Sequence, residues 1–278
     1  MNKELTIIIC TLNGEKTIKN LLDKLQVNTK HYDIIIVDGG SGDKTKEIAQ
    51  NFSCIKFVTK EGIGLLLQRM YAIEIINTEY FSFIDQDDLI DSGDIVKALE
   101  YLKINNLDGV QFKTTSRILN NNYWQKVWAA YFETIYVYNK KINMLGRPCL
   151  TKTYYYKELN LKNRHIKIAM EDTYLNKVLI NNFGNLNYKV APYFSYRLCE
   201  NTFIENWRKW FRYGIGDVQL TENLSSFISS FYHLIFRILL YRSIKTLFSK
   251  NILYFPGILL FSTARLSGFL TNLLYHKK

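Results

Sequence analysis

The sequence holds few of the residues that build zinc sites or disulfide networks. Its 278 residues include four histidines and four cysteines (Cys10, Cys54, Cys149 and Cys199), which lie far apart and form no CxxC spacing. This composition indicates neither a zinc site nor a disulfide framework, and a reducing cytoplasmic compartment is the simplest expectation. The apolar run near the N-terminus is too short for the core of a signal peptide, so we expect the first strand to begin there.

Acidic residues are absent from the last fifth of the chain. Residues 223–278 contain seven Lys or Arg and no Asp or Glu, so they contribute +7 of the formal net charge of +11. A basic chain favours an anionic partner, such as a nucleotide, a phospholipid surface or a nucleic acid. The basicity is therefore largely a property of this tail.

The tail also lacks an uninterrupted apolar run of spanning length. A transmembrane helix needs about 20 apolar residues, whereas the block ILYFPGILLFSTA (252–264) contains Pro256 and is followed by Arg265. Four upstream residues recur at helical spacing: Phe227, Phe231, Leu234 and Ile238. Basic side chains among apolar ones predict helices that lie in the interface of an anionic membrane, at its cytoplasmic face. The alternative is that these helices pack on the rest of the chain or form an oligomer.

Short apolar runs alternate with segments of helical spacing in the first part of the chain. The apolar content of 47% is enough for a core, and four runs predict strands: LTIIICT (5–11), DIIIVD (33–38), CIKFVT (54–59) and YFSFID (80–85). Strands that alternate with helices imply right-handed crossovers and a mostly parallel sheet with helices on both faces, which is the α/β class. Ligands of such sheets bind at the carboxyl ends of the strands.

Polar residues follow three of these predicted strands. Thr11 and Asn13 follow the first, Asp38 and a glycine-rich turn follow the second, and the acidic segment DQDD (85–88) follows the fourth. The preferences of Gly, Ser and Asp for turns and helix caps also explain the second group. The three carboxylates of DQDD repel one another, which predicts a hard divalent cation, Mg²⁺ or Mn²⁺. Such an ion can hold a diphosphate.

The stretches CTLNGEKTI, IIIVDGGSGDKT and FSFIDQDDLI resemble, in order and spacing, the N-terminal half of the family 2 glycosyltransferases, which have the GT-A fold. The resemblance covers roughly residues 5–215. It implies that Thr11 and Asn13 line a nucleotide pocket and that Asp38 reaches the base or ribose. Many members have two aspartates where this chain has Asp38 and Gly39, so the nucleotide stays open, with UDP expected before GDP.

The same resemblance assigns the metal site. Asp85 and Asp87 would form the DxD pair that holds Mn²⁺ or Mg²⁺ and the diphosphate of a nucleotide-sugar. Gln86 and Asp88 would lie beside them in the nucleotide-sugar site.

An acidic pair, Glu171 and Asp172, begins a run of helical spacing within residues 165–184. Taken alone, the pair is explained by the preference of carboxylates for the first turn of a helix. It follows the DxD by about 85 residues, however, and so resembles the ED motif of inverting members. The resemblance implies that Asp172 takes the proton from the acceptor hydroxyl and that Glu171 shapes the acceptor site. Inversion needs one carboxylate on the acceptor side and no covalent intermediate.

The resemblance is weak across residues 117–156, where the acceptor should bind. Arg147 lies in this stretch and is suited to a phosphate or an acceptor carboxylate, with a structural salt bridge as the alternative. The sugar, the acceptor and the linkage are therefore left open.

The segment NWRKWFRYGIGD (206–217) interleaves aromatic and basic residues. Such residues suit nucleic-acid bases, sugar faces or membrane interfaces. The segment is distantly similar to the Q/RxxRW element of processive family members, but the spacing differs. This difference and the lack of several long apolar runs favour a single transfer over a polysaccharide synthase, and no nucleic-acid partner is expected.

These observations predict a metal-dependent inverting glycosyltransferase that adds one sugar to a saccharide acceptor, expected to be lipid-linked. Residues 1–115 would bind the donor, residues 116–222 would bind the acceptor and supply the base, and residues 223–278 would form a membrane-associated tail. The nearest alternative is transfer to a polyprenyl phosphate, because KEGIGLLLQR (60–69) faintly resembles the GLG element of those synthases. A DxD phosphohydrolase would place a hydroxyl residue where this chain has Leu89, and a non-catalytic membrane-binding module would leave the carboxylates unexplained.

Overall fold

Two compact units make up the chain. The computed structural model describes residues 3–135, 140–159, 170–221 and 223–275. The first unit comprises the described parts of 1–114, 137–167 and 171–197, and the second those of 115–136, 168–170 and 198–278. Residues 165–169, which precede the predicted acidic pair, and the last two lysines of the predicted tail lie outside the described residues.

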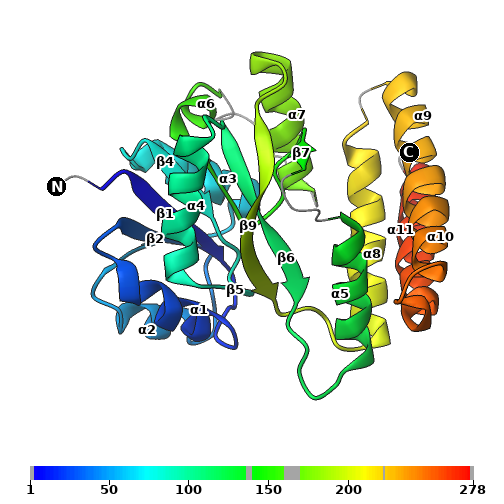
Figure 1. Ribbon diagram of the computed structural model, residues 1–278, viewed down its shortest axis with the longest axis horizontal. Helices are drawn as coiled ribbons and strands as arrows, with labels where there is room; N and C mark the ends of the chain where they lie inside the picture. Colours follow the sequence, from blue (N-terminus) through cyan, green and yellow to red (C-terminus); the bar gives the residue numbers. More distant parts are fainter. Residues whose placement is uncertain (1–2, 136–139, 160–169, 222, 276–278) are drawn as a thin grey trace. The chain divides into compact units, whose positions relative to one another are not determined.

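The first unit is built around one sheet that contains both parallel and antiparallel strands (Figure 1). Within the described residues its nine strands are β1 (Leu5–Thr11), β2 (Tyr32–Asp38), β3 (Ile55–Thr59), β4 (Tyr80–Phe83), β5 (Asp88–Ile90), β6 (Gly109–Ser116), β7 (Lys141–Ile142), β8 (Cys149–Lys152) and β9 (Tyr188–Arg197). Their order is β3-β2-β1-β4-β8-β6-β9-β5, and β7 pairs with β9. The first four strands are parallel to one another, whereas the pairs β4–β8, β6–β8, β5–β9 and β7–β9 are antiparallel. The predicted α/β class is confirmed, and the antiparallel half was not anticipated.

Helices cover this sheet. They are α1 (Ile18–Leu25), α2 (Thr45–Gln50), α3 (Gly64–Ile75), α4 (Ser92–Ile104), α6 (Thr153–Lys157) and α7 (Glu171–Phe183), with a short 3₁₀ helix, η1 (Gln26–Asn28). One apolar core joins α1, α2 and α4 to alternate residues of β1 and β2, among them Ile7, Ile9 and Ile36. Because successive strand side chains point to opposite faces, the other face of these strands is left for α3, which contacts both β1 and β2.

The carboxyl ends of the parallel strands lie side by side. Thr11 pairs with Asp38 in the β1–β2 register, and Asp38 pairs with Thr59 in the β2–β3 register. All seven residues of β1 are buried, as expected of a central strand covered on both faces. After β4, the N–H of Ile84 donates to the carbonyl oxygen of Ile8 at 3.1 Å, which keeps the acidic segment beside β1. The polar residues that follow β1, β2 and β4 therefore lie at one edge of the sheet, as the sequence predicts.

The second unit is helical within its described residues. Its elements are α5 (Tyr123–Ile135), α8 (Phe203–Gln219), α9 (Leu224–Tyr232), a π-helical stretch η2 (His233–Tyr241), α10 (Arg242–Leu247), a 3₁₀ turn η3 (Ile252–Tyr254) and α11 (Phe255–Tyr275). An aromatic cluster joins α5, α8 and α11, in which the ring centroids of Trp128, Trp210 and Phe261 lie 4.8 to 5.3 Å apart. Trp207, Trp210 and Tyr213 of the predicted 206–217 segment thus contribute to a core.

α8 and α11 approach each other backbone to backbone. A Cβ atom on Gly214 would lie 1.9 Å from the carbonyl oxygen of Arg265, and one on Gly268 would lie 2.0 Å from that of Phe211. Next to this contact Arg265 donates to both carboxylate oxygens of Asp217, at 2.6 and 2.7 Å. The two helices are therefore joined by close packing and by a bidentate ion pair.

Pro256 does not interrupt the second apolar block, so that part of the prediction is wrong. α11 runs unbroken from Phe255 to Tyr275, and Pro256 lies in its first turn. At that position proline loses no helical hydrogen bond, because the first N–H groups of a helix have no partner within it. Arg265 does not end the helix either, because arginine is a favourable helix residue, and Asp217 compensates its charge.

Two helical stretches of the described chain are long and apolar enough to cross a membrane, by length and composition alone. They are Leu224–Leu247 and Ile252–Asn272. In the most apolar 18 residues of each stretch, 11% and 44% of the residues are buried, respectively. Of the four residues at helical spacing in the first stretch, Leu234 and Ile238 are buried with Phe227 packed against them, whereas Phe231 is exposed. Most of its other apolar side chains are exposed, including Ile228 and Phe236.

Candidate active site

Three aspartates meet in the turn between β4 and β5. One carboxylate oxygen from each of Asp85, Asp87 and Asp88 lies within 4.8 Å of the other two. The N–H of Asp88 donates to the carbonyl oxygen of Asp85 at 3.0 Å, and the N–H of Asp85 donates to Asp88 Oδ2 at 3.1 Å. The side chains of Asp85 and Asp87 are 28% and 32% exposed, whereas that of Asp88 is fully buried. The cluster therefore offers two accessible carboxylates and one inaccessible one.

Arg197 contacts all three of these carboxylates. It is the last residue of β9, and the β5–β9 register places it opposite Asp88. Its Nε and Nη2 donate to the two oxygens of Asp88 at 2.8 and 2.9 Å, and Nη2 also donates to Asp85 Oδ2 at 3.0 Å. Its Nε lies 4.0 Å from Asp87 Oδ1. Burial raises the pKa of Asp88 to about 7, against the opposing charge of Arg197.

Arg69 of α3 links the acidic turn to the start of α7. Its side chain is 2% exposed, and it donates to Asp85 Oδ1 at 2.7 Å and to Glu171 Oε1 at 2.5 Å. Burial acts to raise the pKa of the Asp85 carboxyl, but Arg69 and Arg197 outweigh it and hold that pKa below its usual value. The DxD turn and the acidic pair, far apart in the sequence, therefore belong to one hydrogen-bonded network.

Glu171 and Asp172 are the first two residues of α7, as predicted. Asp172 Oδ1 accepts a hydrogen bond from the N–H of Thr173 at 2.7 Å, which orients its carboxylate at the helix N-terminus. Glu171 is directed at Arg69, and its side chain is 14% exposed. Burial raises the pKa of Glu171, with the charge of Arg69 opposing. Glu171 thus acts here as the partner of Arg69, and its predicted role at the acceptor stays a prediction.

Asn176 fixes the first turn of α7. This buried side chain donates to the carbonyl oxygens of Asp172 at 2.7 Å and Leu145 at 2.9 Å, and accepts from the N–H of Leu145 at 2.8 Å. The amide nitrogen of Asn176 thereby donates two hydrogen bonds, and its amide oxygen accepts one. The loop before β8 therefore holds the predicted base in place.

The predicted nucleotide residues surround the ends of β1 and β2. Asn13 has a positive φ of 52°, and its Oδ1 accepts from the N–H of Gly42 at 3.0 Å. Thr11 donates its hydroxyl to Gln86 Oε1, which ties β1 to the DxD turn. The buried carboxylate of Asp38 accepts from the N–H groups of Gly40 and Ser41 and from the Ser41 hydroxyl. Asp38 therefore shapes the glycine-rich turn, and its contact with a base or ribose stays a prediction.

A pocket of about 740 Å³ opens at this edge of the sheet. Its lining includes most of the predicted donor residues, namely Thr11, Asn13, Asp85, Gln86 and Asp87. Lys16 and Gln68 also line it, and the exposed ammonium group of Lys16 gives the pocket a cation suited to a phosphate. Lys16 was not among the predicted site residues, although it lies within the stretch CTLNGEKTI.

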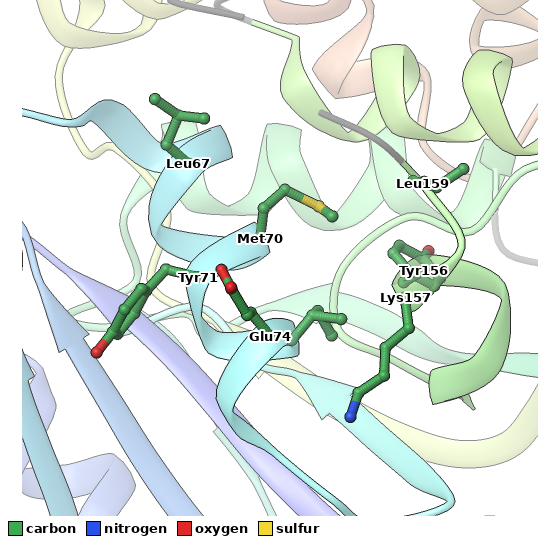
Figure 2. Close-up of a pocket in the computed structure, with 8 residues that line it drawn as sticks. Leu67, Met70, Tyr71, Glu74, Tyr156, Lys157 and Leu159 are labelled. Atoms are coloured by element: carbon green, nitrogen blue, oxygen red, sulfur yellow. The ribbon is translucent and has the colours of Figure 1, made fainter. Parts of the chain in front are cut away.

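A second pocket, of about 490 Å³, lies between α3 and the segment around α6 (Figure 2). Leu67, Met70 and Tyr71 line it from α3, and Tyr156, Lys157 and Leu159 line it from α6 and the residues after α6. The lining is mainly apolar and contains none of the predicted site residues. The polar residues at the strand ends therefore line the larger pocket and not this one.

Comparison with known proteins decides the family. The family described as Glycosyl transferase family 2 matches residues 6–171, more than half of the chain. This chain belongs to glycosyl transferase family 2. Among curated relatives of this family 2 chain, the glycosyltransferase GlyA of Streptococcus pneumoniae serotype 4 is 24% identical over 232 residues, which are 76% of this chain and 33% of the relative. The cholesterol galactosyltransferase of Borreliella burgdorferi is 28% identical over 110 residues, 38% of this chain and 31% of the relative.

Solved structures share the fold of the family 2 chain. Staphylococcus aureus TarS 1–349 in complex with UDP-GlcNAc has a TM-score of 0.58 at 15% identity, over 99% of this chain and 92% of that one. The mannosyltransferase PcManGT of Pyrobaculum calidifontis, in complex with GDP-Man and Mn²⁺, has a TM-score of 0.67 at 11% identity, over 100% and 89%. The predicted GT-A-like fold is thereby confirmed. The chain spans about a third or less of the length of the curated relatives it matches.

The donor set of the family 2 chain fits a hard divalent cation at two of the three aspartates. Asp85 and Asp87 present partly exposed carboxylate oxygens beside the larger pocket, and oxygen ligands suit Mg²⁺ and Mn²⁺. Asp88 does not fit, because its side chain is fully buried, whereas those of Asp85 and Asp87 are partly exposed. The side chains of the predicted metal pair, Asp85 and Asp87, are thus accessible to solvent, whereas that of Asp88 is not.

Arg147 has no carboxylate partner among the residues that the structure describes. It is 4% exposed and lies over the ring of Phe83, 4.6 Å from the centroid. Its Nη1 reaches only the carbonyl oxygen of Leu145 at 3.4 Å and Cys149 Sγ at 3.3 Å, while Nε and Nη2 are buried without a hydrogen-bond partner. The structural salt bridge weighed for this residue is therefore not observed.

Proposed function

We propose that this chain transfers one sugar from a nucleotide-sugar to a saccharide acceptor, with inversion at the anomeric carbon. The observation that carries the proposal is the position of Arg69, which contacts Asp85 of the DxD turn and Glu171 at the start of α7. A charge-assisted contact of this kind joins the DxD turn to the helix start that carries the predicted base, Asp172. Donor binding would fall to residues 1–115, and the base to residues 116–222.

On the donor side, Asp85 and Asp87 would hold Mn²⁺ or Mg²⁺, which supplies positive charge to the departing diphosphate. Thr11, Asn13 and Asp38 would bind the nucleoside, and Lys16 would face the phosphates. The complexes of related folds with UDP-GlcNAc, and with GDP-Man and Mn²⁺, support a nucleotide-sugar donor. A UDP-sugar is expected before a GDP-sugar.

On the acceptor side, Asp172 would be the base. As the acceptor oxygen forms its bond to the anomeric carbon, the bond from that carbon to the diphosphate breaks, and the hydroxyl proton passes to the Asp172 carboxylate. One displacement of this kind inverts the configuration without a covalent intermediate. The hydrogen bond from Thr173 N–H and the contacts of Asn176 support the role by fixing the carboxylate.

The acceptor is proposed to be lipid-linked, and the site of action to be the cytoplasmic face of an anionic membrane. Exposed apolar residues recur along the stretch 224–253, together with the exposed basic residues Arg237, Lys245 and Lys250. Such a surface suits the boundary between headgroups and acyl chains. A relative that is named as a cholesterol galactosyltransferase supports a lipid acceptor.

Calorimetric titration tests the donor half of this proposal. The protein is titrated with UDP and then with GDP, in Mn²⁺ and again in EDTA. We expect one nucleotide to bind at least tenfold more tightly in Mn²⁺, which would also identify the donor class. Folded protein that binds neither nucleotide under either condition would overturn the proposal.

A further inference from the structure

We propose that Arg197 is an internal counter-ion that makes the divalent cation and the nucleotide diphosphate bind to this site as a unit rather than separately. The inference rests on the proposed function, because it concerns the same carboxylates. It adds a role for a residue that the sequence analysis did not single out. Arg197 is a positioning residue in this scheme, since its contacts are to the predicted metal ligands.

Arg197 already contacts the two carboxylates that a cation would need. Its Nη2 donates to Asp85 Oδ2 at 3.0 Å, and its Nε lies 4.0 Å from Asp87 Oδ1. It cannot withdraw completely, because β5–β9 pairing and two hydrogen bonds hold it on the buried Asp88. A guanidinium and a divalent cation at the same two carboxylates repel each other.

The protein itself also supplies positive charge to the network around the three aspartates. The carboxylates of Asp85, Asp87, Asp88 and Glu171 are joined by the two guanidiniums of Arg69 and Arg197. Half of the negative charge is therefore neutralised by the protein itself. A cation on its own meets a weakened electrostatic field.

A diphosphate removes this obstacle. Its anionic oxygens can accept from the N–H groups of Arg197 and coordinate the cation at the same time, which turns a repulsion into two attractions. Arg197 would then exchange its contact with Asp85 for one with the ligand while keeping its contacts with Asp88. Because coupling between two ligands is reciprocal, each should raise the affinity of the other by the same factor.

The test measures Mn²⁺ binding by electron paramagnetic resonance of the free ion. Wild-type protein is titrated with Mn²⁺ alone and with saturating UDP or GDP, whichever it binds, and binding of Mn²⁺ to the nucleotide alone is subtracted. We expect the affinity for Mn²⁺ to be at least tenfold higher with nucleotide. Equal affinities, with nucleotide bound, would overturn this inference and leave the nucleotide-binding proposal standing.

A double variant isolates Arg197. Arg197→Gln with Asp88→Asn removes the guanidinium together with its buried partner, so that no buried charge is left unpaired. We expect it to bind Mn²⁺ without nucleotide at least fivefold more tightly than wild type, with a smaller effect of nucleotide. Arg208→Gln, at an exposed arginine, is the matched control and should change neither value.

The outcomes are distinguishable. Unchanged Mn²⁺ affinity in the folded double variant contradicts the counter-ion role. If the double variant does not fold, equal Mn²⁺ affinities of the wild type with and without nucleotide would still contradict the inference, because that comparison needs no substitution. Absence of nucleotide binding in every condition overturns the proposed function and this inference together.

Discussion

Arg69 and Glu171 form a buried ion pair across 102 positions of sequence. Arg69 lies in the middle of α3, and Glu171 is the first residue of α7. The same guanidinium donates to Asp85, so its removal would leave two carboxylates without their buried partner. Stability and the geometry of the site therefore depend on one side chain.

Replacement of Arg69 should destabilise the protein strongly. Arg69→Met keeps the length of the side chain but leaves Glu171 without its cationic partner and Asp85 with Arg197 alone, and we expect a loss of about 3 to 5 kcal/mol in the free energy of unfolding. Urea denaturation followed by circular dichroism measures it. Lys97→Met, at an exposed lysine, should change stability by less than about 0.5 kcal/mol. A loss for Arg69→Met as small as that of the control would mean that the network is not structural.

Asp172 should be required for turnover but not for nucleotide binding. Asp172→Asn keeps the shape and removes the base, so we expect the transfer rate to fall by about 10² to 10⁴-fold. The nucleotide affinity, measured by calorimetry, should stay within threefold of wild type. Asp94→Asn is the control, because Asp94 is also an acidic residue in the first turn of a helix. Retention of most of the turnover by Asp172→Asn would mean that another group is the base.

Asp87 and Asp88 should respond differently to the same substitution. Asp87→Ala removes an accessible ligand, so Mn²⁺-dependent nucleotide binding should weaken at least tenfold while stability changes by less than about 1 kcal/mol. Asp88→Ala leaves Arg197 partly buried without its main partner, so stability should fall by about 3 to 5 kcal/mol. Calorimetry and urea denaturation on both variants give the comparison. The reverse pattern would move the metal site from Asp87 to Asp88.

Arg147 should be replaceable by an apolar residue. A buried guanidinium with two unpartnered nitrogens is unfavourable, so Arg147→Met should raise the free energy of unfolding by about 1 to 3 kcal/mol. Arg147→Lys retains the charge and should not produce this gain. Thermal denaturation in dilute buffer measures both. A destabilised methionine variant would indicate that an anion binds to Arg147 in solution.

The glycine contact between α8 and α11 should not tolerate a methyl group. Gly214→Ala would place a Cβ 1.9 Å from a backbone oxygen of the neighbouring helix, and a separation of the helices is expected to cost about 1 to 3 kcal/mol or more. Gly42→Ala is the control, since no atom lies within 4 Å of its added Cβ. Urea denaturation separates the two. An unchanged midpoint for Gly214→Ala would refute the close approach.

Sequence patterns anticipated the parts of the site that are local in the chain. Continuous apolar runs predicted β1 and β2 correctly, because central strands buried on both faces show no alternation. The polar residues after them are at the predicted edge of the sheet, since register alone brings Thr11 next to Asp38. Glu171 and Asp172 begin a helix for the same kind of local reason.

The arginines of the site could not be predicted in this way. Arg69 shares a helical face with Leu66, Ala72 and Ile73, and a charged residue on an apolar face was the available signal. Arg197 gave no such signal, because its position opposite Asp88 depends on antiparallel pairing between strands more than 100 residues apart. Pro256 was expected to interrupt a helix, because proline in a helix interior removes a hydrogen bond. It lies in the first turn of α11, where no hydrogen bond is lost.

The ion pair between Arg265 and Asp217 limits how α11 can meet a lipid phase. The helix is long and apolar enough to cross a membrane. Insertion without α8, however, would place the guanidinium of Arg265 in the hydrocarbon core without its partner Asp217. α8 is amphipathic and carries several charges, so the pair of helices resists crossing a bilayer together. The stretch 224–247 has few buried residues and is therefore better suited to contact lipid. α11 packs against it and connects it to the rest of its unit.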